Sequence, residues 1–102
     1  MKKIDATIIK DGIIMLHPVR WKILTALKGK DKEMYIDEIA NMIEEDRRLV
    51  SFHLSILQNR GFLESEFKVL QVPKSKGKAG RFFRLTEKFD KLRPQLAHLI
   101  EG

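Results

Sequence analysis

Two short helix-forming segments joined by an acidic turn constrain the fold of this chain more than any other feature. The first segment carries four apolar residues at the i, i+3, i+4, i+7 spacing of a helix with one buried face, namely Ile36, Ile39, Ala40 and Ile43. The second is predicted to run over Arg47–Arg60, because Asp46 can accept hydrogen bonds from its first amides and Gly61 can adopt the left-handed conformation that ends a helix. Two helices separated by a turn of about three or four residues form a helix-turn-helix.

Two further helices are predicted before this motif. Apolar periodicity indicates a helix over about residues 5–16, for which a strand is the alternative because Gly12 and a β-branched cluster weaken the helix. Pro18 fits the first turn of the next helix, and Gly29 is a natural end for it.

A β-hairpin and a last helix are predicted after the motif. Aromatic and branched residues favour strands over 62–70 and 81–85, joined by a loop rich in Pro, Gly and Lys. Thr86 can cap a helix over about 87–101, which Pro94 kinks or splits. The expected fold class is therefore α+β, mostly α, in the order ααααββα.

The length of 102 residues allows one compact core, so we expect a single domain over 1–102. The terminal helices offer more apolar surface than so small a core should absorb, namely Ile9, Ile13, Leu16, Phe89, Leu92, Leu96 and Leu99. We therefore predict a homodimer in which these helices form the interface.

The formal charge of +6 favours a polyanionic partner, and much of the excess is local. Between Lys68 and Arg84 there are six basic residues and no acidic residue. The absence of cysteine excludes disulfides and thiolate metal sites. Neither a signal peptide nor a membrane span is predicted, so we expect a cytoplasmic protein without membrane contact.

The helix over Arg47–Arg60 has two chemically different faces. On a helical wheel with Val50 as its reference, the predicted buried side holds Leu49, His53, Leu54, Ile56 and Leu57. The other side offers arginines, hydroxyls and amides, which bond phosphates and base edges, from Arg47, Arg48, Ser51, Ser55, Gln58 and Asn59. An ordinary solvated face is the alternative interpretation. Phe52 lies beside these residues, where it can contact a thymine methyl group or, as we favour, pack against a neighbouring element.

The hairpin has a cationic tip that can approach phosphate groups closely. The basic residues of the tip are Lys74, Lys76 and Lys78, and the second predicted strand adds Arg81 and Arg84 to the DNA-binding residues of the wing. A loop that only increases solubility is the alternative. A base-reading helix followed at once by a basic hairpin is the arrangement of a winged helix, so the two signals reinforce each other.

Three motifs resemble those of arsenic-repressor-like (ArsR-type) winged-helix regulators. They are His17-Pro18-Val19-Arg20-Trp21-Lys22-Ile23-Leu24, Asp37-Glu38-Ile39-Ala40 and, most specifically, the run from Val50 to Leu63 that begins Val-Ser-Phe-His-Leu. The resemblance covers roughly residues 14 to 86 and departs from the family in the bulky Trp21. It implies a dimer built by the first and last helices, a recognition helix over Arg47–Arg60 and a wing over about 64–85.

A metal site and an active site are both unexpected. The family's terminal-helix metal site needs two pairs of ligands; His98 and Glu101 match one pair, but Leu85 and Glu87 stand where the other is needed. His17 and His53 are expected to be packed or locally bonded histidines. No nucleophile, base and orienting group can be assembled, so we predict no enzyme and no cofactor.

The function that these features favour is sequence-specific binding to double-stranded DNA by a homodimeric transcription regulator, most simply a repressor. The alternative is a winged-helix module that docks another protein in a transcription or replication assembly. Crowding of lysines at the wing argues against docking, because lysine is depleted at the centres of protein interfaces. RNA binding is disfavoured because the aromatic residues are needed for the core. The sequence leaves room for an effector whose identity it does not give.

Overall fold

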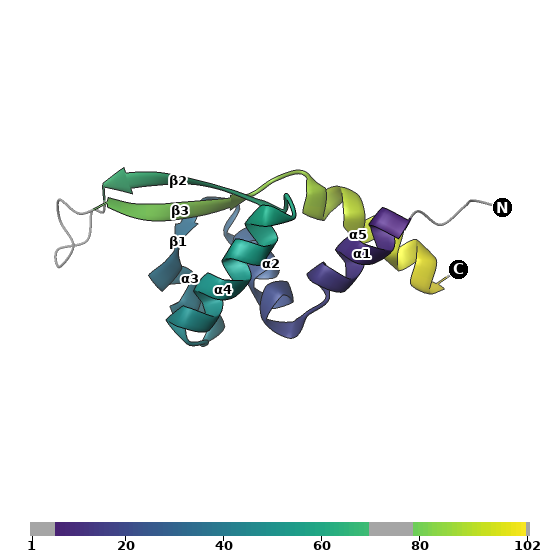
Figure 1. Ribbon diagram of the computed structural model, residues 1–102, viewed down its shortest axis with the longest axis horizontal. Helices are drawn as coiled ribbons and strands as arrows, with labels where there is room; N and C mark the ends of the chain where they lie inside the picture. Colours follow the sequence, from purple (N-terminus) through teal and green to yellow (C-terminus); the bar gives the residue numbers. More distant parts are fainter. Residues whose placement is uncertain (1–5, 70–78, 102) are drawn as a thin grey trace.

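The computed structural model describes residues 6–69 and 79–101, without the side chains of the last three, and confirms an α+β fold with a helix-turn-helix and a β-hairpin. The elements are α1 (Ala6–Met15), α2 (Pro18–Lys30), β1 (Met34–Tyr35), α3 (Ile36–Ile43), α4 (Arg47–Asn59), β2 (Leu63–Val69), β3 (Ala79–Leu85) and α5 (Lys88–Glu101). Helices α1 and α5 lie at one end of an elongated molecule, and the hairpin reaches toward the other (Figure 1).

The ends of α4 are formed by the residues that the sequence predicts. The Asp46 carboxylate accepts hydrogen bonds from the backbone amides of Arg48 at 2.8 Å and Leu49 at 3.3 Å. After the helix, Gly61 has a φ of +83°, a conformation that residues with a Cβ rarely adopt. Both ends of the helix are therefore fixed by local chemistry.

Helix α2 begins as predicted but ends later. Pro18 occupies its first turn, and His17 Nδ1 accepts a hydrogen bond from the Val19 amide at 3.2 Å. The helix passes Gly29 and is closed by Asp31, which has a φ of 52° and whose amide donates to the Leu27 carbonyl. Aspartate tolerates this left-handed conformation better than most residues, so the predicted end at glycine is wrong by one residue.

The sheet contains one strand that the sequence does not predict. Its order is β1-β3-β2, and all pairs are antiparallel. In β1, Met34 pairs with Phe83 and Tyr35 pairs with Phe82. A strand of two residues has no periodicity to detect, so only its pairing with β3 identifies it.

The second strand of the hairpin begins closer to the tip than predicted. β3 begins at Ala79 instead of Arg81, because Ala79 pairs with Val69 and Gly80 pairs with Lys68. Glycine and alanine have low strand propensity, which explains why the pattern assigns them to the loop.

The terminal helices pack closely against each other. The N-terminal segment is a helix rather than the alternative strand, and Gly12 explains its place in that helix: a Cβ atom there would lie only 2.7 Å from Leu96 Cδ2. Helix α5 continues through Pro94 without being split. Gly12 therefore leaves space that the end of the Leu96 side chain fills.

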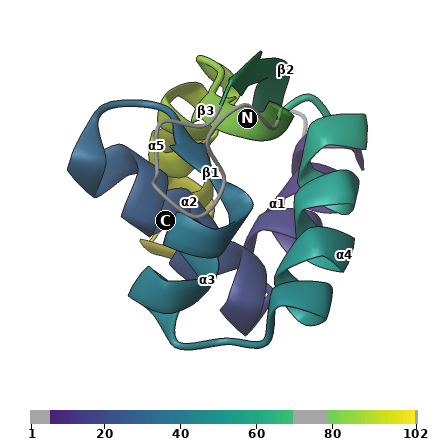
Figure 2. The same ribbon diagram turned by 90° about the vertical axis from the view of Figure 1, so that its left-hand side faces the viewer.

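One core spans the helices and the inner face of the sheet, and Figure 2 shows α2, α3 and α4 beneath the hairpin. Its most buried members include Ile23, Leu24, Leu27, Ile39, Val50, Leu54, Leu57, Phe62 and Phe89. The prediction that Leu49 is buried is wrong, because 39% of this residue is exposed. The true buried arc of α4 is centred on Val50 and Leu57, which turns Leu49 outward.

Candidate nucleic-acid interface

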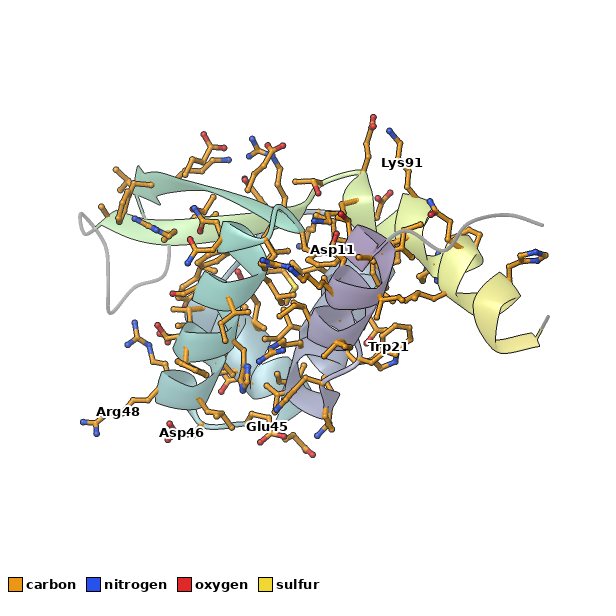
Figure 3. All side chains as sticks on the ribbon, turned by 45° about the vertical axis from the view of Figure 1, so that its right-hand side comes forward. Asp11, Trp21, Glu45, Asp46, Arg48 and Lys91 are labelled. Atoms are coloured by element: carbon orange, nitrogen blue, oxygen red, sulfur yellow. The ribbon has the colours of Figure 1, made fainter. Side chains whose placement is uncertain are left out.

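The outer face of α4 is polar and basic around one aromatic ring. Arg48, Ser51, Phe52, Ser55 and Asn59 are all exposed. Figure 3 shows Arg48 extending from the first turn of the helix, away from the body of the molecule. Among the described residues, no side-chain hydrogen bond or ion pair is formed by Arg48, so its guanidinium is available to an external partner.

Three of the predicted reading residues also have partners inside the chain. Arg47 Nε lies 2.6 Å from the Asp37 carboxylate of α3, and both side chains are largely exposed. The Ser55 hydroxyl donates to the Ser51 carbonyl at 3.2 Å. Gln58 is half-buried.

Gln58 Oε1 accepts a hydrogen bond from the Ser65 hydroxyl at 3.0 Å, which joins α4 to β2. Of the seven residues predicted on this face, Arg48, Ser51, Phe52 and Asn59 are thus exposed side chains without a hydrogen bond or ion pair among the described residues.

Phe52 does not pack against a neighbouring element, contrary to the sequence-based expectation. It is 60% exposed, and its described ring contact is an edge-on approach to the adjacent His53, with centroids 5.1 Å apart. An aromatic ring left in water at the centre of a polar face is costly, and a contact with a partner would remove that cost.

Behind this face, His53 links α4 to α2 and to the end of α1. It is buried, and its Nδ1 accepts a hydrogen bond from Arg20 Nε at 3.1 Å. Arg20 also donates to the Ile14 carbonyl at 3.1 Å, and the His17 ring lies 4.4 Å from the His53 ring. Burial, followed by the charges of His17 and Arg20, lowers the pKa of His53. The expectation of a locally bonded histidine is confirmed for both rings.

The sequence does not identify this Arg20–His53 contact. The two residues stand 33 positions apart, and each belongs to a different one of the three motifs. The only sequence signal for this contact is that both residues belong to motifs shared with the ArsR-type regulators.

The wing divides into a described base and a tip outside the described residues. Lys74, Lys76 and Lys78 all lie outside the described residues. In the base, the exposed Arg81 guanidinium lies over the Phe67 ring at 4.6 Å from its centroid. An arginine stacked in this way keeps donors for a phosphate.

Arg84, predicted as one of the DNA-binding basic residues of the wing, lies among carboxylates. Its guanidinium lies 2.9 Å from Glu64 and 3.1 Å from Glu66, and 3.9 Å from Glu33. Lys68 contacts Glu33 and Glu66 on the same face. Two cations therefore meet three carboxylates. The local basic excess is smaller than the sequence suggests, because the balancing acids come from outside the segment between Lys68 and Arg84.

The predicted dimer residues fall into two groups. Ile9 and Ile13 of α1 and Leu16, in the turn just after it, are exposed by 46%, 67% and 53%. The second group, Phe89, Leu92 and Leu96, is buried within the single chain. The expectation that α5 offers these three to a partner is therefore wrong, because the core of the same chain already covers them. The Leu99 side chain lies outside the described residues.

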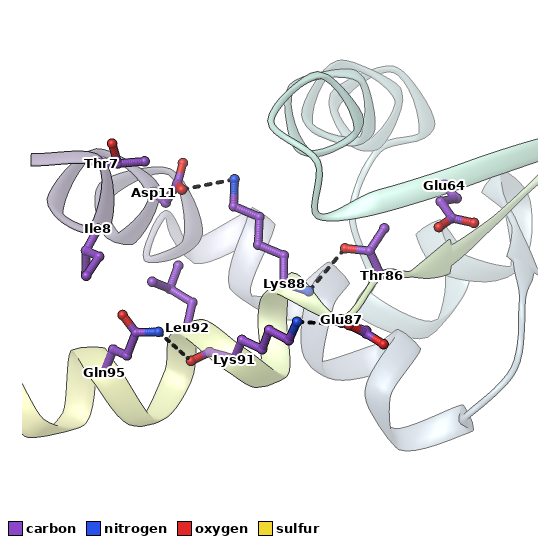
Figure 4. Close-up of a pocket in the computed structure, with 10 residues that line it drawn as sticks. All are labelled: Thr7, Ile8, Asp11, Glu64, Thr86, Glu87, Lys88, Lys91, Leu92 and Gln95. Atoms are coloured by element: carbon purple, nitrogen blue, oxygen red, sulfur yellow. Dashed lines mark hydrogen bonds and ion pairs between the residues drawn. The ribbon is translucent and has the colours of Figure 1, made fainter. Parts of the chain in front are cut away.

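A cavity of about 580 Å³ opens between α1, α5 and the base of the wing (Figure 4). Its walls are formed by Thr7, Ile8, Asp11, Glu64, Thr86, Glu87, Lys88, Lys91, Leu92 and Gln95. Both lysines are paired with carboxylates, Lys88 with Asp11 at 2.9 Å and Lys91 with Glu87 at 3.0 Å.

No three potential ligands from His, Cys, Asp and Glu come together among the described residues to hold a metal. Within the same residues, no helix combines the length and apolar character needed to cross a membrane.

The family model of the arsR bacterial regulatory proteins matches residues 17–65, which span α2, the helix-turn-helix and the start of the hairpin. No curated protein sequence matches the chain.

Solved structures with the same fold cover nearly the whole chain at low identity. The homodimeric winged helix-turn-helix DNA-binding domain of Mb0332 from Mycobacterium bovis has a TM-score of 0.67 and 18% identity, covering 93% of this chain and 79% of its own. The reduced transcriptional regulator YodB from B. subtilis has a TM-score of 0.65 and 18% identity, over 97% and 90%. PcaV, a transcriptional regulator from Streptomyces coelicolor in complex with its natural ligand, has a TM-score of 0.61 and 16% identity, covering 99% of this chain and 79% of its own.

Proposed function

Because residues 17–65 match the family model of the arsR bacterial regulatory proteins, we propose that this chain is a homodimeric repressor that binds a specific sequence of duplex DNA. DNA binding in the control of transcription is supported by the family match and by two structural neighbours, the Mb0332 DNA-binding domain and the transcriptional regulator YodB. The proposal adds sequence specificity, the dimer and repression by occlusion of a promoter.

The observation that carries the proposal is the outer face of α4. The helix is capped by Asp46, and its first turns present Arg48, Ser51 and Phe52 outward. In helix-turn-helix proteins the N-terminal half of the second helix enters the major groove, where arginine bonds guanine and an apolar group contacts a thymine methyl. The wing would then add phosphate contacts, which strengthen binding without reading sequence.

Support for the dimer comes from α1 and from one structural neighbour. Ile9 and Ile13 of α1 and the following Leu16 are exposed, and the Mb0332 domain is homodimeric. We propose one DNA-binding domain over 1–102, with the terminal helices at about 5–16 and 87–101 in the dimer, although α5 contributes less than α1. The proposal also places the protein in the cytoplasm, where its DNA lies, and gives it no catalytic role.

Selection of bound fragments from random and from genomic DNA tests this function. We expect enrichment of one sequence with two half-sites about 10 base pairs apart, or a multiple of that spacing. Binding to the selected duplex should be at least about 10³-fold tighter than to random DNA at the same salt concentration. Enrichment of no common sequence would show that the chain is not a specific DNA reader.

The exposed Phe52 also favours a second candidate, a surface that docks another protein. Aromatic residues are enriched at the centres of protein interfaces, and Leu49 adds a second exposed apolar residue on the same helix. The exposure of Arg48 and the serines beside a basic wing is better explained by DNA binding than by protein docking. The selection experiment separates the two candidates, since a docking module enriches no DNA sequence.

An effector is the last part of the proposal. PcaV binds a natural ligand, and the cavity of about 580 Å³ in this chain is large enough for a small molecule. A screen of small molecules for release of the selected duplex tests for such an effector.

A further inference from the structure

The end of helix α4 is held by the segment that leads into α5. Three consecutive carbonyl groups accept hydrogen bonds from this segment: Arg60 O from Lys88 Nζ, Gly61 O from Thr86 Oγ1 at 2.6 Å, and Phe62 O from the Thr86 amide at 3.0 Å. The Thr86 hydroxyl in turn accepts a hydrogen bond from the Lys88 amide at 3.3 Å. A turn whose successive carbonyls all bond to one segment cannot shift without breaking several of these bonds.

Asp11 of α1 closes this junction from the other side. One carboxylate oxygen lies 2.9 Å from Lys88 Nζ, and the other lies 3.5 Å from Arg60 Nη2. Figure 4 shows the side chain of Lys88 reaching from α5 toward Asp11 beside the cavity. A single carboxylate thus connects α1 to the beginning of α5 and to the end of α4. We call Asp11, Lys88 and Arg60 the clamp.

Burial is unequal within the clamp. The Asp11 side chain is 8% exposed, whereas Lys88 and Arg60 are 33% and 42% exposed. Burying a carboxylate costs free energy unless cations and hydrogen bonds compensate it. The burial of Asp11 therefore favours keeping both of its cationic partners close. The next residue, Gly12, packs against Leu96, which fixes the place of Asp11 between the terminal helices.

We propose that Asp11 is a positioning residue for DNA recognition, because it fixes the direction of α4 relative to the terminal helices. This inference rests on the proposed function. Hydrogen bonds to base edges require the side chains of α4 to lie at defined places in the groove, whereas contacts to phosphates carry no sequence information. Loss of the clamp should therefore weaken binding to the selected sequence more than binding to random DNA.

The variant Asp11→Asn tests the proposal in the full-length protein. It removes the buried charge of the clamp, and the cations that remain, Lys88 and Arg60, are partly exposed to water. The chain should therefore still fold. Its matched control is Asp90→Asn, since Asp90 is exposed and pairs with Lys28 at the same 2.9 Å without touching α4. For Asp11→Asn we expect the ratio of specific to random DNA affinity to fall by about two- to thirtyfold, the range for residues that couple two parts of a protein. For Asp90→Asn it should stay constant.

Hydrogen exchange gives a readout that needs no DNA. The amides of Arg60, Gly61 and Phe62 bond to carbonyls within α4, and they should exchange faster in Asp11→Asn than in Asp90→Asn. Unchanged exchange, or faster exchange with an unchanged affinity ratio, would overturn the positioning role. A wild-type chain that prefers no DNA sequence would overturn the proposed function instead. Faster exchange in Asp11→Asn would then still show that Asp11 holds the end of α4.

Discussion

The two arginines that begin α4 have different surroundings and should differ in function. Arg47 pairs with Asp37 at 2.6 Å, whereas Arg48 has no such partner among the described residues. We expect Arg48→Ala to weaken binding to the selected duplex by about 1–3 kcal/mol and binding to random DNA much less. Arg47→Ala serves as the matched control with a smaller loss. Fluorescence anisotropy on both duplexes measures this, and equal losses on the two DNAs for Arg48→Ala would mean that α4 does not read bases.

His53 should make the free energy of unfolding depend on pH. Burial and the neighbouring cations lower its pKa from 6.5, so below neutral pH the unfolded chain binds more protons at this site than the folded chain. Stability should therefore fall as the pH decreases from about 7 to 5, above the range in which carboxylates titrate.

The variant His53→Gln tests this because glutamine can still accept from Arg20 but does not titrate. Urea denaturation at several pH values should give a flatter profile for His53→Gln than for the wild type. The exposed His98 provides the control, His98→Gln, which should keep the wild-type profile. If His53→Gln also keeps the wild-type profile, groups other than His53 cause the pH dependence of stability.

At the scale of elements, the sequence predicts what local chemistry decides. The helix-turn-helix could be predicted because the spacing of its apolar residues, the cap at Asp46 and the turn at Gly61 all act within a few positions. β1 could not, because two residues form a strand only where β3 is there to pair with them. The charge balance of the wing base was also hidden, since Glu33 reaches Lys68 from 35 positions away.

The wing should supply affinity rather than specificity. Replacing Lys74, Lys76 and Lys78 by alanine is expected to lower affinity for all DNA, and to flatten the dependence of log K on log salt by about one unit for each phosphate that a wing no longer binds. Lys68→Ala is the matched control, because this lysine is held by Glu33 and Glu66 and should leave the slope unchanged. Titrations from low to physiological salt measure the slope. A triple variant with the wild-type slope would remove the wing from DNA binding.

At the scale of the whole molecule, an apolar stripe on a helix does not reveal whether the same chain or a second copy covers it. Phe89, Leu92 and Leu96 have the same helical spacing that a dimer helix would have, yet the core of their own chain buries them. Ile13 and Leu16 have a similar pattern and remain exposed. The distinction depends on which stripe the core of the same chain covers, which is a property of the packed chain rather than of either helix alone.

This distinction decides how the dimer should be tested. Ile13→Glu places a charge on a side chain that is 67% exposed, so the protomer should remain folded while the dimer dissociates. Leu96→Glu would instead bury a charge in the core and unfold the chain. The control Met42→Glu changes another exposed apolar residue, on α3, and should leave the dimer intact.

Light scattering at micromolar concentration measures the oligomeric state, and circular dichroism confirms the fold of each variant. The monomeric Ile13→Glu chain should also bind the selected duplex more weakly, because it engages one half-site at a time. A wild-type monomer, or an Ile13→Glu variant that remains a dimer, would mean that the exposed face of α1 is not where two copies meet.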